Sequence, residues 1–203
     1  MKILFHVQHL LGIGHVRRTA LIARALGEAG AEVTVVQGGF PVAGTDFGRA
    51  RVVQLPPARA ADASFRPILD ETGRPIDDAW RDRRRAMLLA LHDEIRPDAL
   101  ILETFPFGRR AFRFELVPLL ESAAVRDPRP LIASSVRDIL VAKDAAKQRE
   151  MAEWAERWFD LVLVHGDAGM IPFGATFPHA DRLKGRLRHT GYVAPPQSAA
   201  APP

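Results

Sequence analysis

The chain has 203 residues, which is enough for one sizeable α/β domain with its own hydrophobic core. Hydrophobic residues make up 47% of it, no apolar run reaches the ~18 residues of a transmembrane helix, and the lack of cysteine excludes disulfides, thiolate metal sites and a cysteine nucleophile. The net charge is only +4 and the arginines are interleaved with acids, so we do not expect nucleic-acid binding. The opening "MKILFHV" enters a strand pattern without a signal-peptide core, which predicts a cytoplasmic protein.

Seven short apolar runs are predicted strands, at residues 2–7, 32–37, 51–55, 99–104, 131–136, 161–166 and 188–193. Most are continuous rather than alternating, which is typical of strands buried on both faces of a parallel sheet. Helical patterns lie between them at residues 15–30, 77–97, 108–125 and 143–159, the third interrupted by Pro118 and the second opening with the capping residues Asp77 and Asp78. This alternation predicts an α/β fold with a Rossmann-like, doubly wound, mostly parallel sheet of about seven strands.

Two segments depart from this rhythm. Residues 56–76 hold four prolines and mixed charge, and they are expected to form a long excursion with a hairpin at Thr72–Gly73. Residues 194–203, "APPQSAAAPP", are nearly all alanine and proline, which predicts an extended linker. A linker leads somewhere, so we expect a further domain or a partner beyond it.

The turn after the first strand, "LLGIGHVRR" at residues 10–18, is the most informative stretch. Gly12 and Gly14 would permit positive φ and close backbone approach, and the helix that follows offers its positive end to an anion. A tight turn that merely needs small residues explains the same spacing. A dinucleotide site is excluded because Arg17 replaces the third glycine and the second strand ends "VVQGG" without a carboxylate; no Gly-Lys-Ser/Thr follows, which excludes a Walker P-loop.

His15 stands at the start of that helix, where its imidazole can face a cleft. A neutral histidine takes a proton from a hydroxyl near pH 7, and a helix N-terminus disfavours the imidazolium form. The alternative is that His15 only caps the helix or fills the turn. His6 lies in the strand and is expected in the core, and His9 lies in the loop.

These residues resemble a known family. "LLGIGH" followed by "RRTALIARAL" resembles the N-terminal motif of GT-B glycosyltransferases, closest to the family 28-like group and to bacterial proteins called predicted glycosyltransferases. That group includes the lipid II-forming N-acetylglucosaminyltransferase and diacylglycerol galactosyltransferases. Residues 101–121, 134–140, 161–173 and 186–193 resemble its later blocks, in order along the chain.

The resemblance implies that residues 1–193 are an N-terminal acceptor-binding domain and that 194–203 are the interdomain linker. A donor-binding C-terminal domain, absent here or supplied by another subunit, would complete the enzyme, so the isolated domain is expected to be inactive. The implied reaction moves a sugar from a nucleotide-diphosphate sugar to an acceptor hydroxyl, with no metal and no other cofactor. By match to the motif, His15 is the base, while Gly12, Gly14 and Arg17 line the acceptor or diphosphate side.

Glu103 ends the fourth predicted strand, so it is expected at the same edge of the sheet. There it would hold an acceptor hydroxyl or orient His15. The alternative is an ion pair with Arg109 or Arg110 on the next helix.

Four more candidates follow the next two strands. Arg137 and Asp138 come after "LIASSV", where they contact substrate or, as we slightly prefer, pair with each other. His165 and Asp167 follow "LVLV", match a family block and are expected near the cleft, although His165 has the alternative of only fastening the turn.

The helix at residues 79–91, "AWRDRRRAMLLAL", combines Trp80, four arginines and a leucine-rich face. Such a helix can rest on anionic lipid, which would suit a lipid-linked acceptor and a peripheral contact at the inner membrane face. We favour the alternative, in which the leucines enter the core and the arginines are solvated.

We therefore predict that the chain is the acceptor-side domain of a glycosyltransferase. Two alternatives stay open: a non-catalytic module that binds a ligand or partner in the same cleft, and a fragment of a GT-B-fold nucleotide-sugar epimerase.

Overall fold

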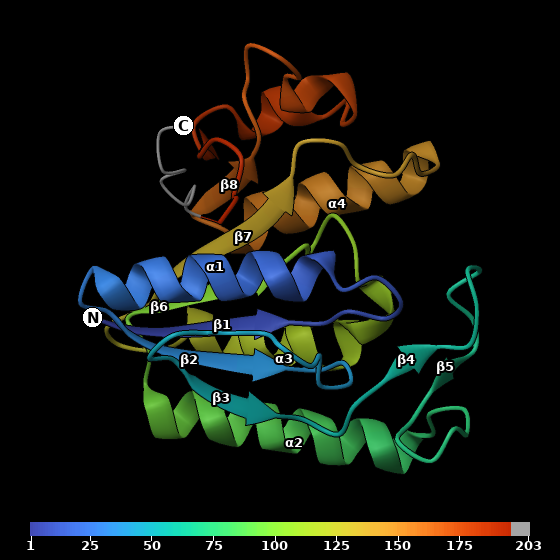
Figure 1. Ribbon diagram of the computed structural model, residues 1–203. Helices are drawn as coiled ribbons and strands as arrows, with labels where there is room; N and C mark the ends of the chain where they lie inside the picture. Colours follow the sequence, from blue (N-terminus) through green and yellow to red (C-terminus); the bar gives the residue numbers. More distant parts are fainter. Residues whose placement is uncertain (196–203) are drawn as a thin grey trace, which may run out of the picture.

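Within residues 1–195, which the computed structural model describes, seven strands form one parallel sheet (Figure 1). The pairings are all parallel and each strand falls on one of the seven apolar runs, so the predicted Rossmann-like, doubly wound sheet is confirmed. The strands are β1 (Lys2–Val7), β2 (Glu32–Gln37), β3 (Arg51–Gln54), β6 (Ala99–Glu103), β7 (Leu131–Arg137), β8 (Leu161–His165) and β9 (Leu187–His189). The last is shorter than the predicted run at 188–193: it starts one residue earlier and ends at His189, before Gly191, which has a φ of 74°. Of the predicted linker at 194–203, residues 196–203 lie outside the described residues.

The strand order is β3-β2-β1-β6-β7-β8-β9. The chain therefore builds outward from β1 to one edge, returns to β6 beside β1, and then builds outward to the other edge. The connections after β1 and β6 leave in opposite directions, and a crevice opens at such a switch point, outside the carboxyl ends of the strands. His15 follows β1 and Glu103 ends β6, so the fold brings both to this crevice.

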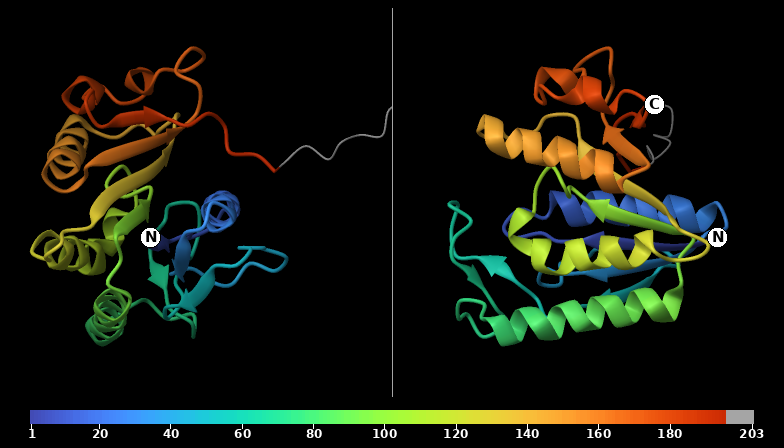
Figure 2. Two further views of the ribbon diagram at one scale, coloured as in Figure 1. Left: turned by 90° about the vertical axis from the view of Figure 1, so that its left-hand side faces the viewer. Right: turned by 180° about the vertical axis from the view of Figure 1, so that it is seen from behind.

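Helix α1 covers one face of the sheet, and α2, α3 and α4 lie on the other (Figure 2). Alternate residues of β1 separate the two cores: Phe5 packs with Ala20 of α1, whereas Leu4 packs with Leu116 of α3. All four are nearly inaccessible to solvent, which is why the strands read as continuous apolar runs. The helices are α1 (Gly14–Glu28), α2 (Asp78–Ile95), α3 (Arg113–Ala124) and α4 (Ala145–Trp158).

The predicted helices agree with these bounds to within a few residues. Asp77 caps α2 as expected, its side chain accepting from the backbone N–H of Trp80 at 2.7 Å. The prediction that Pro118 interrupts the third helix is wrong. Pro118 lies inside a continuous α3, where Leu119 and Leu120 are fully buried and their packing offsets the missing backbone hydrogen bond.

The excursion at 56–76 contains a small second sheet of two antiparallel strands, β4 (Arg59–Ala60) and β5 (Ile68–Leu69). The chain then reverses at the predicted Thr72–Gly73 turn, and Leu69 forms a bridge with Pro75. Asp70 holds that turn, because its carboxylate accepts from the backbone N–H of Thr72 at 2.8 Å. We call residues 59–69 the β4–β5 arm. It projects from the end of the molecule where the main strands finish (Figure 1).

Candidate active site

Glu103 is the centre of a hydrogen-bond network at the switch point. Glu103 is only 2% exposed as a residue, and its side chain is 0% exposed. It lies 3.0 Å from His15 Nδ1, accepts from Ser135 Oγ at 2.5 Å, and forms an ion pair with Arg18. Burial acts to raise the pKa of Glu103, but the hydrogen bond with His15 and the charge of Arg18 outweigh it and lower the pKa to about 2. Glu103 is therefore ionised at neutral pH and can only accept hydrogen bonds.

This network fixes the form of His15. An ionised carboxylate at Nδ1 requires the proton of the neutral ring on Nδ1, which leaves the lone pair on Nε2. Nε2 has no hydrogen-bond partner in residues 1–195, and the side chain is 24% exposed. Glu103 thus orients the ring through Nδ1 and leaves Nε2 available to a substrate, which is the geometry of a general base.

The alternative partners of Glu103 are not found. Arg109 instead donates from Nε to the backbone carbonyl of Gln8 at 2.5 Å, and Arg110 pairs with Glu150 on α4. Nor is His15 the cap of α1, because that position belongs to Ile13.

A second histidine continues the network behind Glu103. His165 is 6% exposed, with Nε2 2.9 Å from Ser135 Oγ and Nδ1 2.8 Å from Thr190 Oγ1. Burial and, to a lesser degree, the charge of Arg18 lower the pKa of His165 to about 4, so the ring is neutral at pH 7. Because Ser135 gives its proton to Glu103, His165 must donate from Nε2 and accept at Nδ1. His165 therefore lies beneath the crevice, where it ties β7 and β8 to the segment after β9.

The glycine turn is open to solvent. Gly12 and Gly14 do not have positive φ, so that expectation is wrong; α1 starts from Ile13, whose backbone is right-handed. A methyl group on either glycine would meet no side chain or distant backbone within 4 Å. The fold does not itself require glycine at these positions, which removes the tight-turn explanation and leaves room for a ligand.

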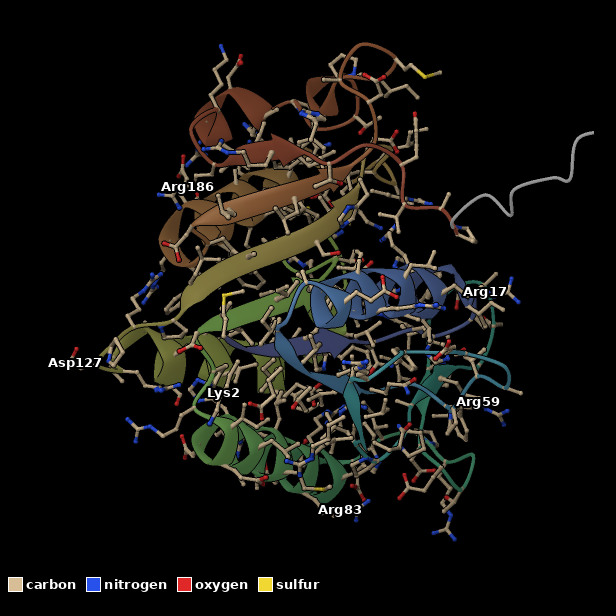
Figure 3. All side chains as sticks on the ribbon, turned by 60° about the vertical axis from the view of Figure 1, so that its left-hand side comes forward. Lys2, Arg17, Arg59, Arg83, Asp127 and Arg186 are labelled. Carbon is tan, nitrogen blue, oxygen red and sulfur yellow. The ribbon has the colours of Figure 1, made fainter. Side chains whose placement is uncertain are left out.

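The N-terminus of α1 is uncompensated. Ile13 makes no capping hydrogen bond from its side chain, and the first turn contains no acidic residue. Arg17 is exposed and forms no ion pair within residues 1–195. In Figure 3 it projects from the same side of the molecule as Arg59, whereas Lys2 and Asp127 lie at the opposite edge. This end of the crevice is therefore positive.

The predicted ion pair between Arg137 and Asp138 is wrong. Arg137 is exposed and forms no salt bridge in the described part of the chain. Asp138 is 7% exposed and accepts from the backbone N–H of Ile139 at 2.9 Å; it fits because its neighbour is Gly166, where a Cβ would lie 2.5 Å from its carboxylate. Asp167 is exposed and accepts from the N–H of Gly169 at 2.8 Å. These three residues lie beside His165 but outside the Glu103 network.

Sequence reasoning missed several members of the network. Arg18 is three residues after His15 and so shares its face of α1, a spacing that the sequence does contain. Ser135 shows only as a small polar residue near the end of a buried strand. Thr104 gives no signal at all: its Oγ1 lies 3.2 Å from His15 Nδ1, and its backbone has a φ of 69°, an unusual conformation for a β-branched residue.

Helix α2 also holds a residue that the sequence placed in solvent. Its leucine face enters the core as expected, but Arg84 is fully buried. Arg84 pairs with Glu115 of α3 at 2.6 Å and donates to Gln8 Oε1 at 2.5 Å. His6 is in the core as predicted, with Nε2 3.5 Å from Glu115. Among residues 1–195, no helix is both long and apolar enough to cross a membrane.

No family model and no curated protein sequence matches the chain. Solved structures do. UGT2 from Phytolacca americana, in complex with UDP-2fluoro-glucose and pterostilbene, is 11% identical with a TM-score of 0.57; the match covers 97% of this chain and 54% of that one. A glycosyltransferase from Rickettsia africae ESF-5 is 10% identical, with a TM-score of 0.56 and coverage of 94% and 42%.

The calicheamicin glycosyltransferase CalG4 is 15% identical, with a TM-score of 0.50 and coverage of 98% and 56%. The chain thus spans about half the length of the solved structures that it matches. At sequence identities of 10–15%, these matches are evidence about the fold only. The chain has the fold of one half of a GT-B glycosyltransferase.

Proposed function

We propose that this chain is the acceptor-binding half of a glycosyltransferase that moves a sugar from a nucleotide-diphosphate sugar to an acceptor hydroxyl. The observation that carries the proposal is the His15–Glu103 pair: an ionised, buried carboxylate lies 3.0 Å from Nδ1, and Nε2 has no partner among the described residues 1–195. A module that only binds a ligand has no need for a histidine held in one tautomer.

The chemistry follows from this geometry. His15 Nε2 takes the proton of the acceptor hydroxyl as the oxygen attacks the anomeric carbon, and the bond from that carbon to the diphosphate oxygen breaks with its electron pair. The imidazolium that forms is stabilised by Glu103. Attack from the side opposite the leaving group inverts the anomeric centre. The open N-terminus of α1 and the Arg17 side chain offer positive charge to the departing diphosphate.

The partner in this proposal is a donor-binding half, joined to this chain or supplied by another subunit. Its support is that the matched glycosyltransferases are about twice as long as this chain. In that arrangement the donor half forms the opposite wall of the crevice, and no metal or further cofactor takes part.

The test is sugar transfer by the enzyme assembled from this chain and its donor half, measured with radiolabelled nucleotide sugars. His15→Ala should lower kcat by at least about a hundredfold, because one general base contributes that much. His189→Ala is the matched control: His189 is exposed on β9 and should be replaced without effect. Near-normal turnover of a folded His15→Ala enzyme would remove the base role.

A further inference from the structure

A cavity lies beside the glycine turn, and neither His15 nor Glu103 lines it. Its volume is about 580 Å³, within the range of small-molecule sites. Three segments line it: the loop after β1, Phe40 in the loop after β2, and the β4–β5 arm. Hydrogen bonds fix the arm in place, since Ala60 N donates to the carbonyl of Leu10 at 3.1 Å. The lining residues are His9, Leu10, Leu11, Phe40, Arg59, Ala60, Ala61 and Leu69.

Arg59 is the one charged residue in that lining. Its guanidinium lies over the Phe40 ring, 5.5 Å from the centroid, and it has no ion-pair partner within residues 1–195. The acids nearest to it along the chain are engaged elsewhere: Asp62 accepts from the backbone of Ser64 and Asp70 from that of Thr72. A guanidinium stacked on a ring still presents the N–H donors of its edge, so Arg59 is free to bind an anion.

His9 marks the other end of the cavity. It is 7% exposed, and its buried Nδ1 has no hydrogen-bond partner among residues 1–195. Burial lowers the pKa of His9, and the charges of Arg109 and His15 lower it further, so the ring is neutral at pH 7. His9 and His15 both lie in the stretch between β1 and the first turn of α1, so this is the end of the cavity that adjoins the glycine turn. Gly39 seats the ring, since a Cβ there would lie 2.3 Å from Nδ1.

We propose that this cavity selects acceptors with an apolar, ring-sized body and a carboxylate, and that Arg59 determines this specificity. The inference rests on the function proposed above. The ring lies against Phe40 and Leu69, its hydroxyl points past His9 toward His15, and its carboxylate binds the edge of Arg59. A single unpaired guanidinium balances one negative charge, which fits a carboxylate better than a doubly charged phosphate. The planar guanidinium can also donate two parallel hydrogen bonds to the two oxygens of one carboxylate.

The test is fluorescence titration of the 203-residue chain with two probes, 6-hydroxy-2-naphthoate and 2-naphthol. They share the ring and the hydroxyl and differ in the carboxylate. We expect naphthoate to bind about tenfold more tightly than naphthol, the size of a typical charge-assisted hydrogen bond. Arg59→Gln should remove that preference while leaving the affinity for naphthol within about twofold. Arg66→Gln, an exposed arginine of the same arm outside the cavity lining, should keep it.

A second variant tests the same group without removing it. Leu69 is the cross-strand neighbour of Arg59 in the arm. Leu69→Glu should therefore supply Arg59 with a carboxylate of its own and remove the preference for naphthoate over naphthol. Circular dichroism should show that each variant stays folded. Equal affinity of the native chain for both probes, no binding of either, or an unchanged preference in Arg59→Gln would overturn the proposal.

The two proposals fail in different experiments. Probe binding needs no donor sugar, so the titrations of the native chain and of Arg59→Gln are read independently of the transfer assay. If Arg59 sets the preference but His15→Ala transfers sugar normally, the base role fails and the carboxylate selectivity stands. If His15→Ala is inactive but the native chain does not prefer naphthoate, the selectivity fails alone.

Discussion

The two glutamates Glu115 and Glu103 are buried to almost equal depth, and they are used differently. Glu115 is 0% exposed and Glu103 2% exposed, and each pairs with an arginine and a histidine. Around Glu115 every group is enclosed: Arg84 also donates to the carbonyls of Gly38 and Pro56, so its donors are spent inside the protein. Around Glu103 the network ends at a ring that reaches the surface. A closed network holds elements together, whereas one with a single open end holds a reactive group in place.

Breaking the closed network should have the largest effect on stability. Arg84→Met leaves the Glu115 carboxylate buried without its partner, which should lower the free energy of unfolding by about 3–5 kcal/mol. Urea denaturation measures it. The double variant Arg84→Met, Glu115→Leu should recover most of the loss, because it removes the stranded charge as well. A loss below about 1 kcal/mol in the single variant would show that the pair is not needed.

The open network should respond to acid. The pKa of Glu103 is lowered to about 2 in the folded chain from an ordinary value of 4.5, so the charge contributes its full stabilisation above pH 4.5 and loses it as the pH falls toward 2. The difference amounts to about 3 kcal/mol. Glu103→Gln should lose stability of that order at pH 7.

The same variant should flatten the acid dependence. Urea midpoints of the native chain should fall between pH 5 and pH 3, partly because the pKa of Glu115 is lowered too. In Glu103→Gln the fall should be shallower over that interval. An equally steep fall in both proteins would show that Glu103 is not held ionised.

The smallest effect on stability is expected at the glycine turn. Gly14→Ala adds a methyl group where no other group contacts it and improves helix propensity, so the free energy of unfolding should stay within about 0.5–1 kcal/mol of the native value or rise. In the assembled enzyme the same change should lower sugar transfer about tenfold or more if a substrate approaches the backbone there. Thermal unfolding and kcat/KM separate the two effects. Unchanged kcat/KM would mean that no substrate comes close to Gly14.

Local pattern was sufficient to predict the sheet. Each strand is a continuous apolar run because helices cover both faces, and the positions of His15 and Glu103 after β1 and β6 follow from chain order alone. What the sequence does not contain is the partner of each polar side chain. Periodicity placed Arg84 in solvent, because the acceptors that make its burial tolerable, Glu115 and Gln8 among them, are distant in sequence. Proximity along the chain likewise suggested that Arg137 pairs with Asp138. In the structure Asp138 is buried and accepts from the backbone N–H of Ile139, whereas Arg137 is exposed.

The position of β1 has a consequence for how the protein is made. Strand β1 lies inside the sheet and leaves the ribosome well before β6, which covers its second edge with Phe5 opposite Ile101. At about 5–20 residues per second, some five to twenty seconds of synthesis separate the two strands. During that interval the edge of β1 that β6 later covers is unpaired. The nascent chain therefore exposes an unpaired strand edge until β6 has emerged from the ribosome, and a chaperone that binds extended apolar segments should act on it in that interval.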